Sequence, residues 1–272
     1  MNQEYIIKEK IDLTSFLLSK FSKKNVKMLL KNKCVLVNDK EVTKYDYLLN
    51  INDKIKLVKK IDDIIIVYED KDIIIVDKPS NMLTVSDLKE KEKTLYYKVS
   101  DYLKSKNKNS KVFVVHRLDY ETSGLVIFAK NQLVKDKLQN NWNQVKRGYQ
   151  AVIHGKLKES KRLIFNLKEN RSLLVYVTKK DRFTKESITN YTVVKFNDKY
   201  SLVNILIETG RKHQIRVSFK EIGHPIVGDK KYGNDSFKYL YLYANELSFI
   251  HPITKNRIDI IRPIKEEFKR LI

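Results

Sequence analysis

The segment VHRLDYETSGLVIFAK, residues 115–130, carries the main clue to the fold. The apolar runs KVFVV (111–115) and GLVIFAK (124–130) predict two strands, and the polar turn HRLDYETS joins them. Asp119 lies in this turn, two residues after Arg117. A carboxylate positioned by two strands is rigid yet reachable from outside, as a nucleophile or general base must be. The alternative is an Asx turn, in which the carboxylate only accepts hydrogen bonds from nearby backbone amides.

A second polar segment, ETGRKHQIRVSFKEIGHPIVGDKKYG (208–233), holds four of the seven glycines of the chain. Its apolar spacing predicts a helix. One face of that helix carries Ile215, Phe219 and Ile222. Four basic residues gather near its start: Arg211, Lys212, His213 and Arg216. Such a group favours an anion, either an RNA phosphate or a catalytic carboxylate that stays ionised. In the alternative interpretation, His213 and Gln214 only satisfy backbone groups.

The charge of the chain is strongly positive. Its 272 residues include 55 Lys and Arg against 33 Asp and Glu, a formal net charge of +22. This charge favours nucleic acid or an anionic membrane surface as a partner. No apolar run approaches the roughly 18 residues that span a bilayer, and the opening residues MNQEYIIKEK do not resemble a secretory signal. We therefore expect a soluble, cytoplasmic protein with no membrane partner.

The composition gives no sign of a metal site. Cys34 is the single cysteine, which excludes an internal disulfide and a cysteine-based zinc site. The five histidines are not paired at metal-ligand spacing and form no HExxH motif. They are His116, His154, His213, His224 and His251. We expect neither a metal nor a cofactor.

Residues 1–60 are predicted to form a small domain of their own. Apolar residues recur at helical spacing in two short stretches, and short alternating runs follow as strands. We expect Asn25 to cap the second helix. That helix carries four lysines: Lys23, Lys24, Lys27 and Lys31. They are interpreted either as an RNA-binding face or as an ordinary solvated helix surface.

Residues 61–272 are predicted to form a larger domain. Strands are expected in the runs near 64–77, in the two runs around Asp119, at 149–153, at 239–243, and in a pair within 191–208 joined by Asn197-Asp198-Lys199. Helices are expected at 88–111, with an exposed surface, and at 133–142. Many strands paired through turns, with helices between them, indicate an α+β fold with a mixed, largely antiparallel sheet.

Several segments resemble one known family. HRLDYETSGLVIFAK, GRKHQIRVSFKEIGHPIVGDKKYG and ANELSFIHPIT closely resemble, in this order, the signature segments of the RluA family of RNA pseudouridine synthases. DIIIVDKPSNMLTV resembles the family's Lys-Pro turn, and residues 1–60 are similar to the S-four-type RNA-binding module, named for a ribosomal protein. The chain departs from the family at Asn81 and near Asn32-Lys33-Cys34, where glycine is usual, and at Ser218-Phe219.

The resemblance implies an S-four-like RNA-binding domain at 1–60 and a pseudouridine synthase catalytic domain at 61–272. Such an enzyme breaks the N1–C1′ bond of a uridine in structured RNA, turns the base and rejoins it through C5. The reaction needs no redox step, metal or energy source. Asp119 matches the catalytic aspartate of the family, and attack on the base and action at the sugar are both open.

Other site residues also come from the resemblance. Arg216 matches the arginine that pairs with this aspartate, and an adjacent guanidinium favours an ionised carboxylate. Tyr149, in KRGYQAVIHG, matches the tyrosine that packs against the target base. Arg117 matches an arginine that fills the gap left by a flipped nucleotide. The further RNA-binding candidates are Arg211, His213, Lys23, Lys24, Lys27 and Lys31.

Three functions compete on this sequence. The leading one is a monomeric synthase that acts on structured RNA, with ribosomal RNA, and its large subunit in particular, favoured over tRNA. A non-catalytic RNA-binding or ribosome-assembly protein on the same fold has no need of Asp119, Arg216 and Tyr149 together. A DNA-binding regulator lacks a recognisable groove-reading motif.

Overall fold

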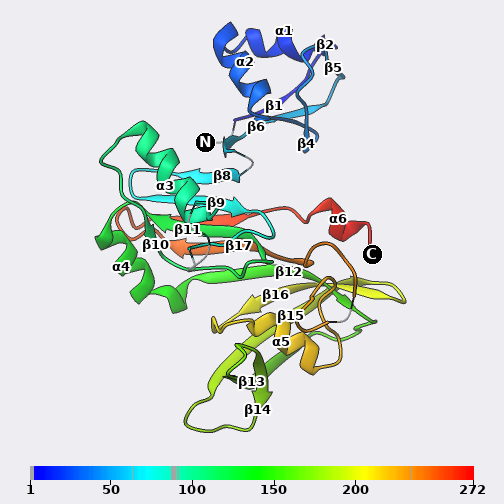
Figure 1. Ribbon diagram of the computed structural model, residues 1–272. Helices are drawn as coiled ribbons and strands as arrows, with labels where there is room; N and C mark the ends of the chain where they lie inside the picture. Colours follow the sequence, from blue (N-terminus) through cyan, green and yellow to red (C-terminus); the bar gives the residue numbers. More distant parts are fainter. Residues whose placement is uncertain (1–2, 63, 87–89, 91, 234) are drawn as a thin grey trace. The chain divides into compact units, whose positions relative to one another are not determined.

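The structure, a computed structural model, describes residues 3–62, 64–86, 90, 92–233 and 235–272 (Figure 1). Within it the chain divides into two units, Met1–Asp77 and Lys78–Ile272. The strand β7 (Lys59–Ile61) spans the boundary drawn from the sequence at 60/61. The separate RNA-binding role of residues 1–60 stays a prediction.

The first unit contains two short helices packed on small sheets. α1 (Leu13–Leu18) and α2 (Lys23–Lys31) bury Leu13, Leu17, Val26 and Leu30 against apolar residues of the strands. The four-stranded sheet has the order β1-β6-β3-β4, and β2 pairs with β5. These strands are β1 (Gln3–Ile6), β2 (Ile11–Asp12), β3 (Val35–Val37), β4 (Lys40–Glu41), β5 (Leu48–Leu49) and β6 (Lys54–Leu57). Next, β7, β8 (Ile64–Glu69) and β9 (Ile73–Lys78) pair as an antiparallel meander.

The ends of α2 differ from the sequence prediction. Ser22, not Asn25, is the N-cap: the Ser22 hydroxyl accepts the backbone N–H of Asn25 at 3.4 Å. Asn25 lies inside the first turn of α2, and its own backbone N–H is one of the groups that need a hydrogen-bond acceptor. The cap must therefore come from a residue before it. At the other end, Lys33 takes the left-handed conformation, with φ of 53°, and Cys34 donates its N–H to the carbonyl of Leu29 at 2.8 Å. This Schellman-type end places Lys33 at a position where glycine is commonly found.

The second unit is built on a long sheet with the order β14-β13-β15-β16-β12-β17-β11. β10 pairs with β11, and β18 pairs with β17. The strands are β10 (Phe113–Val114), β11 (Ser123–Ala129), β12 (Lys146–His154), β13 (Lys161–Glu169), β14 (Val175–Thr178), β15 (Lys185–Phe196), β16 (Tyr200–Ile207), β17 (Leu242–Ile250) and β18 (Arg257–Ile261). β11 runs parallel to β17, whereas the neighbours of β12 and β15 run antiparallel. The predicted α+β class with a mixed, mostly antiparallel sheet is confirmed.

The strand β11 pairs with β17 and with β10. All seven of its residues are buried, as its continuous apolar run predicts. Gly124 on β11 has φ of 127°, and a Cβ added there would lie 2.3 Å from the carbonyl oxygen of Ala244. Only glycine allows this close approach of β11 to β17, which fixes the end of the strand next to Asp119.

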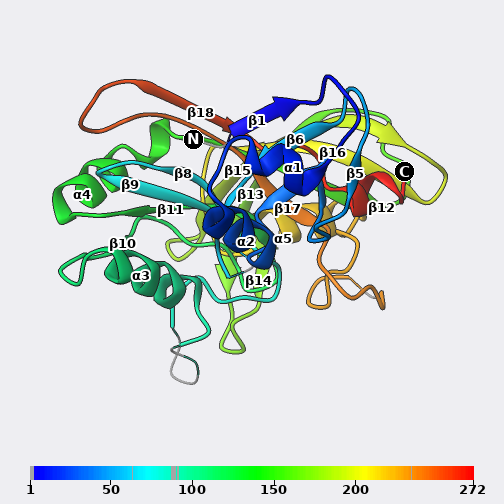
Figure 2. The same ribbon diagram turned by 90° about the horizontal axis from the view of Figure 1, so that it is seen from above.

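Helices pack against the sheet at several places (Figure 2). α4 (Gln132–Asn140) lies against β10, where the Gln139 side chain donates to the carbonyl of Val115 at 2.9 Å. α5 (Gln214–Glu221) packs Ile215 and Phe219 into the core formed by β12, β15 and β16. The short helices η1 (Trp142–Gln144) and α6 (Glu266–Lys269) complete the unit. None of the helices in the described ranges is long and apolar enough to cross a membrane.

Two element predictions were wrong in extent. The helix expected at 88–111 is α3 (Leu95–Lys106), capped by Thr94, and it buries Leu95, Val99 and Leu103 rather than being exposed throughout. Residues 88, 89 and 91 of the predicted helix lie outside the described residues. The strand expected at 239–243 begins only at Leu242, and β13, β14 and β18 were not predicted. β13 mixes charged and apolar residues without a regular alternation, and β14 and β18 are short.

Candidate active site

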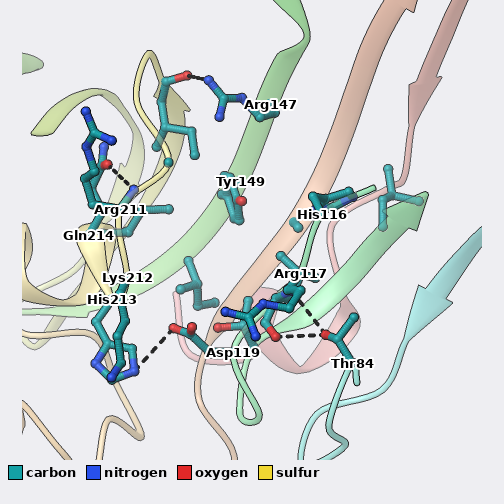
Figure 3. A pocket seen from close by; sticks show the side chains of 18 of the residues that line it. Thr84, His116, Arg117, Asp119, Arg147, Tyr149, Arg211, Lys212, His213 and Gln214 are labelled. Carbon is teal, nitrogen blue, oxygen red and sulfur yellow. Dashed lines mark hydrogen bonds and ion pairs between the residues drawn. The ribbon is translucent and has the colours of Figure 1, made fainter. Parts of the chain in front are cut away.

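A pocket of about 500 Å³ opens in the second unit between β12, the turn before β11 and the start of α5 (Figure 3). Its lining includes the predicted residues Arg117, Asp119, Tyr149, Arg211, His213 and Arg216. Segments that are distant in the sequence therefore meet at one cavity. The four lysines of α2 belong to the other unit, where their side chains are exposed.

The turn that carries Asp119 is held by the segment just after β9. The ammonium of Lys78, fully buried, donates to the carbonyls of Met82 at 2.7 Å and Tyr120 at 3.1 Å. The Thr84 hydroxyl donates to the carbonyl of Leu118 at 2.9 Å and accepts the N–H of the same residue at 3.2 Å. These bonds fix the backbone on both sides of Asp119. At position 81, Asn takes a φ of 59°, and Asn tolerates this left-handed conformation where the family has glycine.

The Asp119 carboxylate faces two basic side chains. Its Oδ2 lies 3.7 Å from Nη1 of Arg216 and 3.9 Å from Nε2 of His213. Both separations are ion-pair distances and too long for hydrogen bonds. No hydrogen bond to this carboxylate occurs within the described part of the chain, so the Asx-turn alternative is wrong. With 30% of its side chain exposed, Asp119 is open to a ligand in the pocket.

Arg216 is the buried cation behind this carboxylate. Its side chain is 1% exposed, and its Nε and Nη2 donate to the two oxygens of the buried Asp229 at 2.8 Å each. Nη1 remains, and it donates to Oε2 of Glu121 at 3.1 Å and faces Asp119. Burial alone would lower the pKa of the Arg216 guanidinium, but the hydrogen bonds and charge of Asp229, with Glu121 and Asp119, raise that pKa above its ordinary value. The bidentate pair orients the arginine, and its free edge points at Asp119.

His213 is oriented by Tyr232. Nδ1 of His213 lies 2.7 Å from the Tyr232 hydroxyl, whose oxygen already accepts the N–H of Val175 at 3.1 Å. The tyrosine proton is therefore available to Nδ1, which leaves the imidazole proton on Nε2, the nitrogen nearest Asp119. Burial lowers the pKa of His213; the charge of Asp119 opposes this effect, whereas nearby Arg216 adds to it. The imidazole is thus neutral at pH 7.

Comparison with known proteins agrees with this geometry. The family described as RNA pseudouridylate synthase matches residues 72–221, which contain the segments around Asp119 and Arg216. The chain belongs to this family. It is therefore an RNA pseudouridine synthase, an isomerase, and its relatives are of the RluA type.

Individual relatives of this synthase carry different RNA names. A ribosomal large subunit pseudouridine synthase D of Blochmanniella floridana is 30% identical over 96% of this chain and 92% of its own. A tRNA pseudouridine synthase C of Haemophilus influenzae is 31% identical over 76% of this chain and 95% of its own. A solved structure, human RNA Pseudouridylate Synthase Domain Containing 4, is 20% identical, covers 75% of this chain and 90% of its own, and has a TM-score of 0.63. It supports the fold.

The remaining predicted residues of the synthase line the pocket in different ways. Tyr149 on β12 is half-buried, and burial raises its pKa to about 12, so its hydroxyl stays neutral at pH 7. Arg117 is exposed at the pocket, next to Asp119. Arg211 is also exposed, and its Nε donates to the carbonyl of Glu186 at 2.9 Å. The structure thus brings the catalytic candidates together and leaves two arginines at the opening.

Sequence reasoning missed four side chains of the synthase site. Glu121 and Asp229 neutralise Arg216, Tyr232 orients His213, and Arg147 lines the pocket beside Tyr149. Glu121 lies in the HRLDYETS turn, Asp229 and Tyr232 lie in GDKKYG, and Arg147 lies in KRGYQAVIHG, so all four stood inside the quoted motifs. Nothing in their spacing distinguishes them from ordinary turn residues, because their partners come from other elements.

Proposed function

We propose that Asp119 is the catalytic aspartate of this RNA pseudouridine synthase. One observation carries the proposal: its carboxylate, which forms no hydrogen bond with any described residue, lies in a pocket and faces the oriented edge of Arg216. A buried guanidinium beside a carboxylate favours the ionised form, which a nucleophile or base requires. The isomerisation breaks N1–C1′ and forms C5–C1′ within one nucleotide, and the proton on C5 is replaced by one on N1.

The other pocket residues have distinct proposed roles. Tyr149 supplies the ring against which the uracil packs. An aromatic ring can stack on any flipped base, whatever hydrogen-bonding groups that base carries. Arg117, exposed at the opening, occupies the space that the flipped uridine leaves. Arg211 supplies a positive charge at the rim that favours the RNA backbone, and His213 offers a neutral imidazole as a further RNA contact.

The proposed substrate is structured RNA, with large-subunit ribosomal RNA favoured over tRNA. Support comes from the extent of the likeness: the relative named for the large subunit aligns along 96% of this chain, against 76% for the relative named for tRNA. In this proposal residues 1–60 form an S-four-like module that captures RNA through the exposed lysines of α2, and the enzyme acts as a monomer.

Mapping of pseudouridine in cellular RNA tests the substrate. RNA from cells with and without the gene is marked chemically and sequenced, with wild type or Asp119→Asn restored on a plasmid. We expect a defined uridine of large-subunit ribosomal RNA to lose its modification without the gene and to regain it with wild type alone. Loss confined to tRNA would overturn the substrate, and rescue by Asp119→Asn would overturn the catalytic assignment.

A further inference from the structure

Arg147 is a buried cation whose position the reaction does not explain. It lies on β12, two residues before Tyr149, and both side chains line the pocket (Figure 3). The residue is only 6% exposed. A charged side chain buried to this degree is normally paired with an opposite charge, since loss of hydration is costly.

The hydrogen bonds of Arg147 use only part of its guanidinium. Nε donates to the carbonyl of Val145 at 3.2 Å, and Nη2 donates to the carbonyl of Glu208 at 2.9 Å. Nη2 also lies 3.5 Å from the carbonyl of Ile207. Across the described residues, Nη1 has no hydrogen-bond partner and no carboxylate forms an ion pair with Arg147. Burial lowers the pKa of this guanidinium, as expected for a cation whose charge is not compensated.

Gly210 keeps the unpartnered side of Arg147 open. A Cβ added to Gly210 would lie 3.0 Å from Nη1, which is tighter than an ordinary contact. Both residues line the pocket, so a ligand can reach Nη1 past the glycine.

Most other charges of the pocket are already paired within the protein. Arg216 is held by Asp229, and Lys212 forms an ion pair with Glu169. Glu246 is also paired, because Lys146 lies 2.6 Å from its carboxylate. Among the described residues, no carboxylate of the lining therefore compensates the charge of Arg147.

We propose that Nη1 of Arg147 binds a phosphodiester oxygen of the RNA next to the target uridine. The inference rests on the proposed function, since it assumes that the uridine packs on Tyr149. A phosphodiester fits better than a uracil carbonyl because a hydrogen bond between two charged groups is roughly twice as strong as a neutral one. Arg147 thus acts as a binding and positioning residue that sets the register of the RNA backbone over the pocket.

Replacing single phosphates of the RNA tests this contact without changing the protein. Each phosphate around the target uridine is replaced in turn by an uncharged methylphosphonate, and affinity is measured for wild type, Arg147→Met and Arg162→Met. Arg162 is the matched control, because it forms an exposed bidentate pair with Glu208 at 3.0 Å outside the pocket. We expect one methylphosphonate position to weaken wild type and Arg162→Met about tenfold.

Arg147→Met should bind unmodified RNA about tenfold more weakly and be insensitive at that same position. For Arg147→Met, the slope of log affinity against log salt concentration should be shallower by about 0.7 to 0.9 than for wild type. The proposal would be overturned if all three proteins were equally sensitive to methylphosphonate at every position. It would also be overturned if Arg147→Met lost sensitivity to 4-thiouridine at the target position and not to a phosphate substitution. If Arg147→Met does not fold, the proposal is overturned when no methylphosphonate position weakens RNA binding by wild type. Pseudouridine formation by wild type on unmodified RNA tests the proposed function separately.

Discussion

At the scale of single residues, the site depends on how one guanidinium is shared among three carboxylates. Asp229 takes two nitrogens of Arg216 in a fully buried pair, and the third nitrogen serves Glu121 and Asp119. The buried pair is structural, whereas the Asp119 carboxylate that faces Arg216 lines the pocket. Removing the arginine therefore has two separable effects, one on stability and one on turnover.

Arg216→Met should destabilise the protein by about 3 to 5 kcal/mol, because it leaves the Asp229 carboxylate buried without a partner. Single-turnover pseudouridine formation should fall at least about a hundredfold. Adding Asp229→Asn should restore much of the stability, measured by urea unfolding, but not the turnover. Arg162→Met is the control, and loss of its exposed pair should cost at most about 1 kcal/mol. Recovery of turnover in the double variant would show that Arg216 acts on structure alone.

The imidazole of His116 should make stability depend on acid. Its Nε2 accepts the N–H of Ile127 at 3.1 Å, its ring stacks on Trp142, and burial lowers its pKa from 6.5 to about 3. As the pH falls, His116 takes up a proton in the unfolded chain before it does so in the folded protein. The stability that neutral His116 contributes is therefore complete above pH 6.5 and is lost as the pH falls toward 3.

The free energy of unfolding should fall by at most about 1.4 kcal/mol per pH unit because of His116, and by roughly 3 kcal/mol between neutral pH and pH 4. Urea unfolding from pH 7 to pH 4 measures it, and His116→Gln, whose side-chain oxygen can still accept the Ile127 N–H, should show a shallower pH dependence. Parallel curves for the two proteins would contradict this assignment.

The residue scale also shows what the sequence could reveal. Asp119, Arg216 and Tyr149 stand in long motifs, and the structure brings all three to one pocket. Asp229 and Arg147 could not be assigned, because the partners that define them lie on other strands and helices. The unfilled edge of Arg147 in particular is a property of packing and leaves no pattern along the chain.

At the scale of elements, helix ends and turns account for most differences between prediction and structure. Apolar spacing located α1, α2, α4 and α5 within a few residues. The cap of α2 was misplaced because Ser22 and Asn25 are both good capping residues. β13 was missed because its charged and apolar residues do not alternate regularly, and β18 because it has only five residues.

Lys33→Gly should stabilise the first unit by about 1 kcal/mol, because Lys33 bears the cost of a left-handed conformation at the end of α2. Lys31→Gly, two residues earlier inside the helix, should destabilise it by about 1 kcal/mol. Hydrogen exchange of the α2 amides reports both changes. A loss of protection in Lys33→Gly would contradict the Schellman-type end.

The basic surface of α2 should contribute to RNA capture and not to chemistry. Neutralising Lys23, Lys24, Lys27 and Lys31 should flatten the fall of affinity with salt, by about one unit on a log-log plot for each lysine that contacts a phosphate. Single-turnover chemistry at saturating enzyme should change little.

The matched control neutralises four exposed lysines at the end of α3 and after it. They are Lys104, Lys106, Lys108 and Lys111. An equal loss of salt dependence in both variants would assign the effect to net charge. A collapse of saturated turnover with intact binding would place the α2 surface in the catalytic step.

At the scale of the whole molecule, the chain divides into two units. The pocket and its charges belong to Lys78–Ile272, and the lysine-bearing helix belongs to Met1–Asp77. The net charge of +22 suits a protein whose partner is RNA. Family membership established the isomerase, while the identity of the RNA depends on surfaces that read a folded partner and so cannot be derived from the motifs around Asp119.

The most direct test of the account is single-turnover pseudouridine formation by Asp119→Asn on the RNA that wild type modifies. The amide keeps the shape of the side chain and removes its charge, so we expect no pseudouridine, with RNA affinity and unfolding free energy nearly unchanged. Tyr120→Phe, which changes an exposed neighbour in the same turn, is the control and should keep its turnover. Measurable turnover by Asp119→Asn would contradict the assignment of the catalytic aspartate.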